Sequence, residues 1–271
     1  MNICLFEESQ ISQPLSFDDK RGEHLLNVLH KKQGDDFTAG IIDGASGVAH
    51  ITKIDDAARK IFFEFTPTGD GKPLNQLKMI VGFPRPIQLR RLLRDVAALG
   101  VCELHLTGTE LGEKSYMQSD LAQPEAAREL LLEGTVQAGS THVPEVFVHK
   151  SLSECLGWLS LSKPQQDMPV NGGFDKLNHH LICLDNVNPA CSLGEVEFSG
   201  GPSLRQAQDK LSSGTTVVAA IGSERGWTDK ERSLLEKAGF IRCGMGERIM
   251  RTETAATVAG AIILNAMGVL K

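Results

Sequence analysis

The sequence predicts a two-part protein in which a small β-rich domain precedes an α/β domain built on a parallel sheet. Short strand-like runs separated by Gly and Asp turns fill the first part of the chain. A cluster of Pro and Gly at Thr66–Pro73 then interrupts this pattern. Beyond it, apolar strand-like runs alternate with helix-like segments, the order typical of a parallel sheet covered by helices. The predicted domains are residues 1–72 and 73–271.

Composition places the chain among ordinary globular proteins. Its 271 residues are enough for two cores, and 41% of them are hydrophobic. No apolar run approaches the roughly 18 residues needed to cross a bilayer, and the acidic N-terminus is unlike a secretory signal. The six cysteines are scattered without a C-x-x-C pair, so no metal and no redox motif are expected. Together these features predict a cytoplasmic protein.

The first domain is expected to form a small barrel. Strands are predicted at Asp36–Gly44, which ends in an Asp-Gly turn, at the alternating segment Gly47–Ile54, and at Lys60–Phe65. Glu23–Leu29 has apolar residues three and four apart and is expected to form a short helical segment. Short strands joined by such turns favour a barrel over an open sheet.

The second domain is expected to alternate strands and helices. Strands are predicted at Leu77–Phe83, Val101–Leu106, Val146–Val148, Leu181–Leu184 and Thr215–Ile221. Helices are predicted at Ile87–Leu99, Gln123–Ala138, from about Leu152, at Asp229–Lys237 and at Thr252–Met267. Gly100 and Gly139 stop two of these helices. Part of Gly157–Asn178 is expected to be a surface loop. The last two strands are continuously apolar, which indicates burial on both faces.

Two glycine-bearing loops late in the chain are candidates for a ligand site. Ile221–Trp227 follows an apolar strand, and Thr228 or Asp229 with Glu231 would cap the next helix as in a capping box. Gly244–Ala255 links another apolar run to a long helix. Glycines followed by helix N-termini suit a ligand held by backbone amides.

Plainer structural interpretations of both loops remain open. The first is also what an ordinary strand-to-helix connection looks like, and Arg251 with Glu253 is also a favourable way to begin a helix. The Gly-Lys-Ser/Thr element of a nucleotide-binding P-loop is missing, and no Gly-x-Gly-x-x-Gly follows the first strand. The missing glycine pattern therefore argues against a Rossmann dinucleotide site.

Two basic clusters stand out against a net charge of −6. The overall charge argues against a general nucleic-acid coat, but local patches can still contact phosphates. Solvated surface is the alternative interpretation of such charge runs. One cluster lies in each predicted domain: Lys20, Arg21, His24, His30, Lys31 and Lys32 in the first, and Arg85, Arg90, Arg91 and Arg94 in the second.

The motifs of this chain resemble the RsmE family of ribosomal RNA methyltransferases in the SPOUT superfamily. Met245 through Ala255 reads Met-Gly-Glu-Arg-Ile-Met-Arg-Thr-Glu-Thr-Ala and resembles the family motif Leu-Gly-x-Arg-Ile-Leu-Arg-x-Glu-Thr-Ala. Gly222–Trp227 resembles its Gly-Pro-Glu-Gly-Gly-Phe loop. The resemblance spans nearly the whole chain and also includes His24–Leu29 with Gly34-Asp35, Ala98–Val101, Glu133–Gln137 and Val143–Glu145.

Departures from the family pattern lie more on the expected RNA side than in the cofactor loops. In the first glycine loop, Ser223 and Arg225 replace the Pro and Gly of the family. The other departures from the family pattern are at His30, Asp95, Ala98 and the segment Glu113-Lys114-Ser115. Two alternatives therefore stay open. One is a catalytically silent RNA-binding or ribosome-assembly protein of the same fold, and the other is a SPOUT enzyme with a different RNA target.

The resemblance implies a fold and an activity. The fold is a PUA-like RNA-binding barrel followed by a SPOUT domain whose C-terminal end forms a trefoil knot, a rare topology. The activity is transfer of a methyl group from S-adenosylmethionine to N3 of a uridine in 16S ribosomal RNA of the 30S subunit, by a cytoplasmic homodimer with its active site at the subunit interface. No metal and no membrane are implied.

The resemblance also assigns residues. Arg251 and Glu253 are the catalytic candidates, because Arg251 could stabilise charge on the uracil oxygens and Glu253 could orient Arg251 or accept the proton. The expected RNA contacts are Lys31, Lys32, Arg85, Arg90, Arg91 and Arg94. The expected cofactor-binding residues are Leu184, Ile221, Gly222, Ser223, Glu224, Gly226, Met245, Gly246, Ile249, Met250, Arg251, Thr254 and Ala255.

Overall fold

The computed structural model describes residues 2–161, 179–196 and 216–270. Contacts between residues divide the chain into two compact units. The first contains Met1–Leu74 together with Leu132–Val143, and the second contains Asn75–Leu131 with Pro144–Lys271. From residue 162 onward, the surface loop predicted within Gly157–Asn178 lies outside the described residues.

The first unit contains a five-stranded mixed sheet. Its strand order is β1-β3-β4-β5-β2, with β1 parallel to β3 and the other pairs antiparallel. The strands are β1 (Cys4–Phe6), β2 (Leu15–Ser16), β3 (Asp36–Ile41), β4 (Ser46–Asp55) and β5 (Lys60–Gly69). The three longer strands were predicted, whereas β1 and β2 are too short to show a period in the sequence. The core of this unit is Cys4, Phe6, Leu15, Leu25, Phe37, Ala39, Ala49, Ile51 and Ile61.

Two local details differ from the sequence-based expectation. The predicted linker Thr66–Pro73 was partly wrong, because β5 continues through Gly69 and pairs with the start of β4. Gly47 allows this pairing: a Cβ there would lie 2.1 Å from the carbonyl oxygen of Thr66. The helical segment predicted at Glu23–Leu29 is confirmed, but most of it is a π-helical turn, η1 (His24–Val28), which directly follows the short helix α1 (Lys20–Glu23).

The second unit contains a seven-stranded sheet in which every neighbouring pair is parallel, which confirms the predicted α/β class. Its order is β10-β12-β9-β11-β6-β7-β8. The strands are β6 (Asn75–Gly82), β7 (Val101–Thr107), β8 (Glu145–His149), β9 (His179–Leu184), β10 (Cys191–Ser192), β11 (Thr216–Ile221) and β12 (Ile241–Gly244). β10 was not predicted, and β12 was anticipated only as a short apolar run before the second glycine loop. All six residues of β11 are buried, as expected for a strand covered on both faces.

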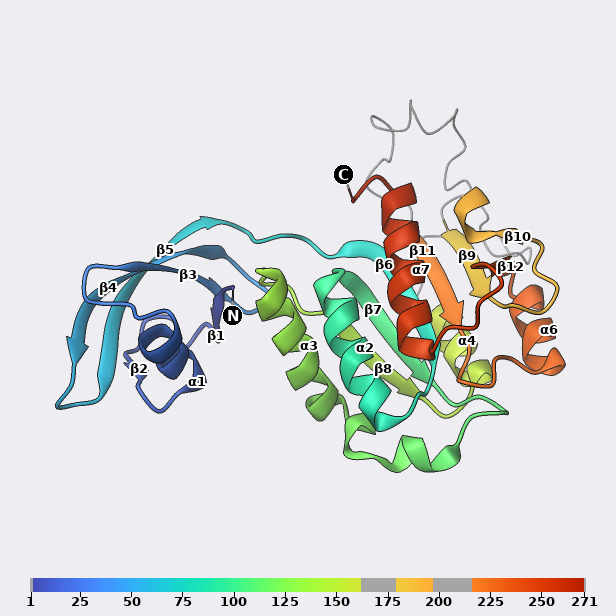
Figure 1. Ribbon diagram of the computed structural model, residues 1–271, viewed down its shortest axis with the longest axis horizontal. Helices are drawn as coiled ribbons and strands as arrows, with labels where there is room; N and C mark the ends of the chain where they lie inside the picture. The colour runs from blue at the N-terminus through green and yellow to red at the C-terminus, as the bar shows by residue number, and fades with distance from the viewer. Residues whose placement is uncertain (1, 162–178, 197–215, 271) are drawn as a thin grey trace. The chain divides into compact units, whose positions relative to one another are not determined.

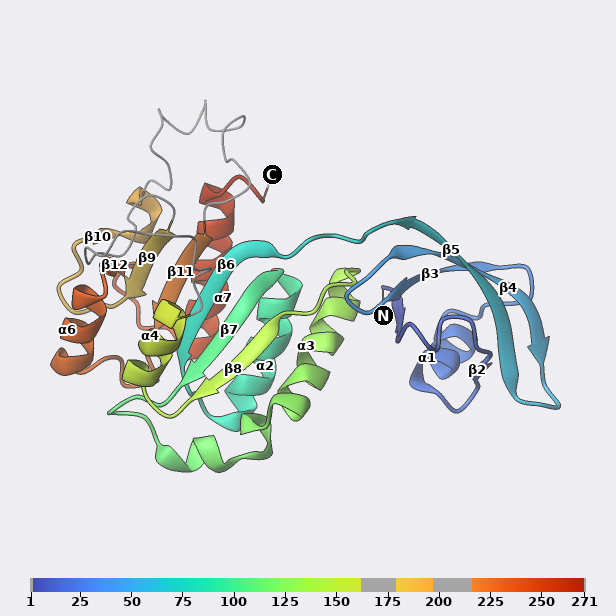
Figure 2. The ribbon, with the colours of Figure 1, turned by 180° about the vertical axis from the view of Figure 1, so that it is seen from behind.

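Helices cover both faces of this sheet (Figures 1 and 2). On one face, α2 packs against α7, and on the other α4 and α6 share a core with the sheet. The helices are α2 (Pro86–Ala98), α3 (Pro124–Ala138), α4 (Leu152–Leu161), α6 (Asp229–Lys237) and α7 (Thr252–Ala266), with short 3-10 turns η2 (Lys114–Gln118), η3 (Asp120–Ala122) and η4 (Leu193–Glu195). Gly100 and Gly139 end α2 and α3 with φ of 68° and 65°.

The parallel order of the strands determines where a site can form. Because all seven strands run the same way, their carboxyl ends meet at one edge, where ligands of open α/β sheets bind. The loops after β9, β11 and β12 emerge side by side there, since β9 lies between the other two. Among the described residues, no helix is both long and apolar enough to span a bilayer.

Candidate functional site

A cavity of about 270 Å³ lies at the carboxyl ends of β9, β11 and β12. It is bounded by the three loops that follow these strands and by the first turns of α6 and α7. The residues lining it are Leu184, Asp185, Asn186, Val187, Ile221, Gly222, Ser223, Glu224, Arg225, Gly226, Arg232, Cys243, Met245, Arg248, Ile249, Met250, Thr252 and Ala255.

The loop after β11 is a tight turn closed by its own backbone. The N–H of Gly226 donates to the carbonyl of Ser223 at 2.8 Å, and Gly226 has a φ of 72°, which favours glycine. A Cβ on Gly222 would lie 2.9 Å from the Cα of Gly226, so both glycines are needed for this turn. The hydroxyl of Ser223, which accepts a hydrogen bond from Thr109 at 3.0 Å, is buried beneath it.

The loop after β9 carries a buried ion pair. The guanidinium of Arg232, on α6, donates from Nε to the Asp185 carboxylate at 2.6 Å. The side chains are only 14% and 5% exposed, and the hydrogen bond to Asp185 raises the pKa of Arg232 further. The N–H of Val187 also donates to Asp185, at 3.0 Å. The cavity therefore has one wall of fixed, paired charges.

The loop after β12 supplies the opposite, mainly apolar side. Met245 and Met250 are half-buried, while Ile249 is 88% exposed. Gly246 has a φ of 94° with open space where a side chain would stand. Burial, followed by a hydrogen bond to Cys191, raises the pKa of the Cys243 thiol to about 12, so this thiol is uncharged at neutral pH, and the charged residue that this loop contributes to the cavity lining is Arg248.

As the sequence predicted, a capping box forms at the start of α6, and it fixes the end of the loop after β11. Thr228 accepts from the N–H of Glu231 at 3.2 Å, and Glu231 accepts from the N–H of Thr228 at 2.9 Å. Glu231 is 2% exposed and also accepts from the N–H of Glu110 at 2.9 Å. This one carboxylate thus joins α6 to the loop after β7.

Most of the predicted cofactor-binding residues meet in this cavity. Ten of the thirteen line it: Leu184, Ile221, Gly222, Ser223, Glu224, Gly226, Met245, Ile249, Met250 and Ala255. The remaining three, Gly246, Arg251 and Thr254, lie in the same loop or the first turn of α7 without reaching the cavity wall.

The two predicted catalytic residues are two positions apart in the chain but lie in different surroundings. Arg251 is the exposed N-cap residue of α7, whereas Glu253 is 5% exposed in its first turn. One carboxylate oxygen of Glu253 has no hydrogen-bond partner among the described residues. Within that part of the chain, no hydrogen bond or ion pair joins Arg251 to Glu253.

Sequence reasoning missed the loop after β9 and its partner on α6. Asp185, Asn186, Val187 and Arg232 line the cavity without having been predicted. One signal was available: Leu181–Leu184 was recognised as an apolar strand, and polar residues follow it directly. The sequence does not show that this strand lies between the two strands that lead into the glycine loops.

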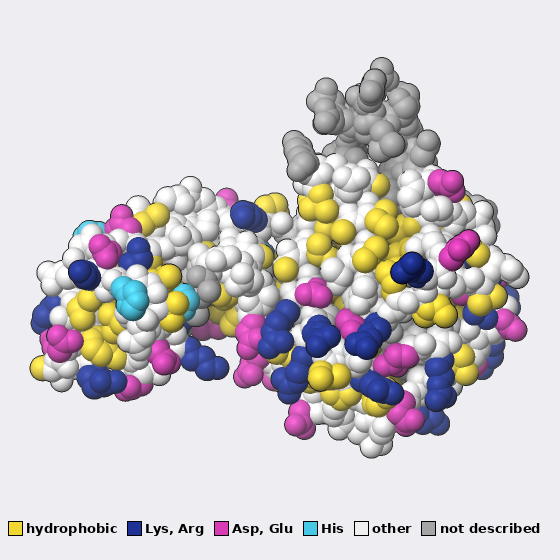
Figure 3. Space-filling view, viewed as in Figure 1, with side chains coloured by type: hydrophobic (Ala, Val, Ile, Leu, Met, Phe, Trp, Pro, Cys, Tyr) yellow, Lys and Arg dark blue, Asp and Glu magenta, His cyan; other side chains and the backbone are white. Residues whose placement is uncertain are grey.

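Basic side chains gather over α2 (Figure 3). Arg90, Arg91 and Arg94 of this helix are exposed. Arg85 precedes the helix, where its Nε donates to the hydroxyl of Tyr116 at 2.9 Å and its backbone N–H to Glu224 at 3.2 Å. Because Glu224 lines the cavity, Arg85 connects the basic surface to the site.

In the first unit, the two predicted RNA-binding lysines follow the helical segment. Lys31 is partly buried and Lys32 is exposed. Their separation into a different unit from the α2 arginines agrees with the two clusters seen in the sequence.

The comparisons with known proteins agree with this geometry. A family model described as the RNA methyltransferase domain matches residues 71–171 and 173–264. Ribosomal RNA small subunit methyltransferase E of Treponema pallidum (strain Nichols) is 39% identical over 267 residues, covering 97% of this chain and 91% of that protein. The Borreliella burgdorferi protein ribosomal RNA small subunit methyltransferase E 1 is 27% identical over 264 residues, covering 97% of each.

A solved structure shares the fold. It is a ribosomal RNA small subunit methyltransferase E from Neisseria gonorrhoeae bound to S-adenosyl methionine, with a TM-score of 0.70 and 22% identity, covering 98% of this chain and 97% of that one. The match of the domain model over most of the chain and the identity to the Treponema protein lead to one conclusion: this chain belongs to the RsmE family of ribosomal RNA small subunit methyltransferases.

Proposed function

We propose that this protein transfers a methyl group from S-adenosylmethionine to N3 of a uridine in 16S ribosomal RNA of the small subunit. The observation that carries the proposal is the cavity after β9, β11 and β12, because the two loops bearing the family motifs line it from both sides. Its volume of about 270 Å³ is close to the lower end of small-molecule sites, roughly 300–1,000 Å³.

The residues around the cavity fit the chemistry of this cofactor. Leu184, Ile221 and Met250 offer apolar surface for a flat base, and the turn at Gly222–Gly226 presents backbone groups for polar contacts. S-adenosylmethionine supplies an electrophilic methyl group on a sulfonium centre. The paired charges of Asp185 and Arg232 would orient its polar tail without adding an unpaired charge to the site.

The protein's part in the reaction is to help the uracil N3 proton leave and to stabilise the resulting charge. Free N–H acids of this kind are deprotonated only well above neutral pH, so alignment alone is not sufficient. In the proposal, Arg251 stabilises negative charge on the uracil oxygens, since this exposed residue at the N-terminus of α7 is accessible to RNA. Glu253 accepts the proton, because it is a buried carboxylate with one unpartnered oxygen.

For RNA binding, we propose that the α2 arginines and the two lysines of the first unit contact phosphates. In this proposal, residues 1–72 form a PUA-like RNA-binding barrel and residues 73–271 form a SPOUT domain. Replacing Arg90, Arg91 and Arg94 by alanine should weaken binding to 30S subunits and lower the salt slope by about one unit per lost contact. Equal binding at every salt concentration would assign these arginines to ordinary solvated surface.

We also propose the knotted topology and the dimer of the family. Support for the knot comes from strand order, because the chain passes from β11 on one side of β9 to β12 on the other before α7 returns to pack on α2 and β6. Hydrophobic side chains visible over α7 support a second copy covering that face (Figure 3). The ribosomal substrate places the reaction in the cytoplasm.

One experiment tests the central proposal. Purified protein is incubated with labelled S-adenosylmethionine and 30S subunits from a strain lacking this enzyme, and the modified nucleotide is mapped. Label on N3 of one 16S uridine is the expected result. Label at another position would indicate a different RNA target. Binding of cofactor and subunits without any transfer would identify a silent RNA-binding protein instead.

A further inference from the structure

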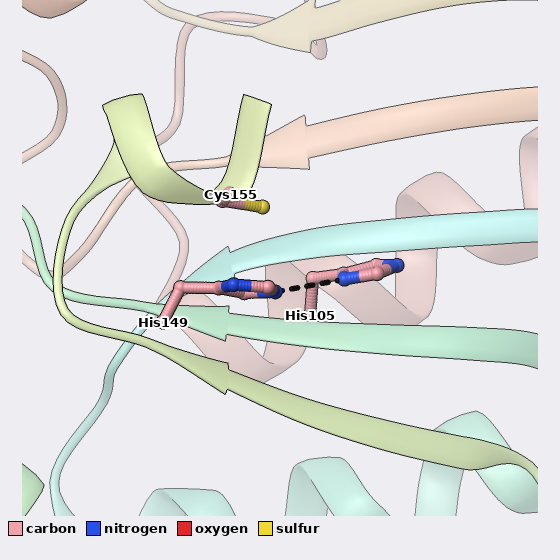
Figure 4. A group of neighbouring side chains, drawn as sticks. All are labelled: His105, His149 and Cys155. Carbon is pink, nitrogen blue, oxygen red and sulfur yellow. Dashed lines mark hydrogen bonds between the residues drawn. The ribbon is translucent and has the colours of Figure 1, made fainter. Parts of the chain in front are cut away.

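Three metal-ligating side chains meet in the interior of the second unit, outside the cavity described above (Figure 4). They are His105 of β7, His149 at the end of β8 and Cys155 of α4. Their ligand atoms all lie within 4.8 Å of one another, and Nδ1 of His105 is 3.0 Å from Nε2 of His149. All three residues are buried, with exposed fractions of 0%, 4% and 0%.

The fold explains why these residues meet. In the parallel pair β7–β8, His105 is opposite Phe147 and Thr107 is opposite His149, so both imidazoles stand on the same face of the sheet. That face is covered by α4, whose Leu152 and Cys155 belong to the core cluster on this side. The three ligands therefore come from three elements, and no spacing in the sequence could reveal them.

A carboxylate sets the orientation of the first imidazole. Nε2 of His105 is 3.2 Å from Oε2 of Glu103, and the other oxygen of Glu103 is 2.6 Å from Nζ of Lys78. A carboxylate accepts the Nε2 proton, so the lone pair of His105 is on Nδ1, the atom that faces His149. Metal-binding histidines show this same carboxylate contact on the ring nitrogen away from the metal.

Aromatic side chains enclose the cluster. The ring of Phe147 stacks on His105 with centroids 5.0 Å apart, and the Trp158 ring lies 4.9 Å from His105 and 6.1 Å from His149. These contacts restrict rotation of both imidazoles. A core without a function for two histidines would gain by replacing them with apolar residues, since each buried polar group has to be desolvated.

We propose that His105, His149 and Cys155 form a binding site for a closed-shell late transition-metal ion, Zn²⁺ or Cu⁺. A thiolate with two neutral imidazoles is a donor set that both ions accept. Two nitrogens on one tetrahedral ion are about 3.3 Å apart, so the observed 3.0 Å requires only a small opening. On binding, the S–H bond of Cys155 breaks, the sulfur–metal bond forms and the proton passes to solvent, while His149 binds as its Nδ1–H tautomer.

The role of such a site would be structural. β8 is the outermost strand of the seven, and the ion would tie it to β7 and to the helix that covers it. A metal that binds only the folded chain raises the melting temperature in proportion to its binding free energy. The site is independent of methyl transfer, so it can be tested without an activity assay.

The test uses the whole chain, treated with a chelator and then titrated with Co²⁺ as an optical probe. We expect about one Co²⁺ per chain, with the absorption band of a thiolate–cobalt bond. Zn²⁺, or Cu⁺ under anaerobic conditions, should displace the probe, and the tighter competitor identifies the ion. Cys155→Ser should abolish the band, whereas Cys183→Ser, a buried cysteine of the same core, should leave it unchanged.

Two further variants keep the test decisive if Cys155→Ser folds poorly. His149→Gln should abolish tight binding, and Glu103→Gln should weaken it by about 10- to 100-fold while keeping the band, as expected for a positioning residue. Zn²⁺ should raise the melting temperature of the wild type but not of His149→Gln. Absence of a thiolate band in the wild type, or an equal band in Cys155→Ser, would overturn the proposal and leave the cluster a buried hydrogen-bonded pair.

Discussion

Replacing Arg232 by alanine removes the cation that the buried Asp185 carboxylate faces. That carboxylate is 5% exposed and receives Nε of Arg232 at 2.6 Å and Nη2 at 3.4 Å. After the change, the hydrogen-bond donor left to Asp185 among the described residues is the N–H of Val187 at 3.0 Å. Arg232→Ala should therefore destabilise the second unit and disturb the wall of the cavity.

The magnitude follows from the burial of the pair. Removing one partner of a buried ion pair costs about 3–5 kcal/mol, and the lower end applies here because Val187 still donates. For a unit of this size, each kcal/mol corresponds to roughly 2–4 °C in melting temperature, so Arg232→Ala should melt about 6–12 °C below wild type. Asp185→Asn/Arg232→Ala, which leaves no unpaired charge, should regain part of this loss.

Thermal melts followed by calorimetry provide the measurement. The matched control is Lys230→Ala on the same helix, since Lys230 forms an equally short ion pair with Glu110 at 2.6 Å but is 75% exposed. Exposed pairs contribute little, so this control should melt close to wild type. If Arg232→Ala melted as the control does, burial of the pair would not be what stabilises this loop.

Three other changes test separate parts of the molecule. Gly246→Val forces a β-branched residue into a φ of 94°, at a cost of roughly 1–3 kcal/mol, and should weaken S-adenosylhomocysteine binding in calorimetry by about fivefold or more; unchanged affinity in a folded variant would contradict this. Arg251→Ala should slow single-turnover methylation by at least ~100-fold with little change in melting; a normal rate would make Arg251 only the start of α7. The hydrogen bond from Arg21 holds the pKa of Asp19 below its ordinary 3.8, so the pair stabilises the fold above about pH 4 and this contribution is lost as pH falls through the lower folded pKa. In an acid titration followed by fluorescence, Asp19→Asn should lose less stability than wild type below about pH 4. The same loss of stability in both proteins would show that the pair does not stabilise the fold.

Local signals in the sequence predicted the elements of the second unit well. The helix Asp229–Lys237 was placed at its observed bounds because Thr228 and Glu231 form a capping box that depends only on neighbouring residues. Gly100 ended its helix for a similarly local reason, a left-handed backbone that glycine adopts easily. β10 was missed and β12 was seen only as an apolar run without bounds, because two and four residues are too few to show a period.

The candidate site was predictable only where the motif residues are contiguous. The loops Gly222–Gly226 and Met245–Met250 were found because each carries its signal within a short segment. Asp185 and Arg232 were missed because their pairing depends on β9 lying between β11 and β12, which chain order does not reveal. The sequence left two roles open for Glu253, to orient Arg251 or to accept the proton, because it could not show that Glu253 is buried while Arg251 is exposed.

The pairing of β6 with β11 has a consequence for folding during translation. Leu77 of β6 lies beside Val217 of β11, so the edge of β6 that faces β11 stays unpaired until most of the chain has been translated. Long-range parallel pairing also slows folding, because the entropy of closing a large loop is lost before the stabilising contacts between the strands form. Until the last quarter of the chain leaves the ribosome, the apolar edge of β6 can pair with incorrect strands. The nascent chain is therefore a candidate for chaperone binding. The sheet that carries the cavity can thus form only when the ribosome has translated nearly the whole chain.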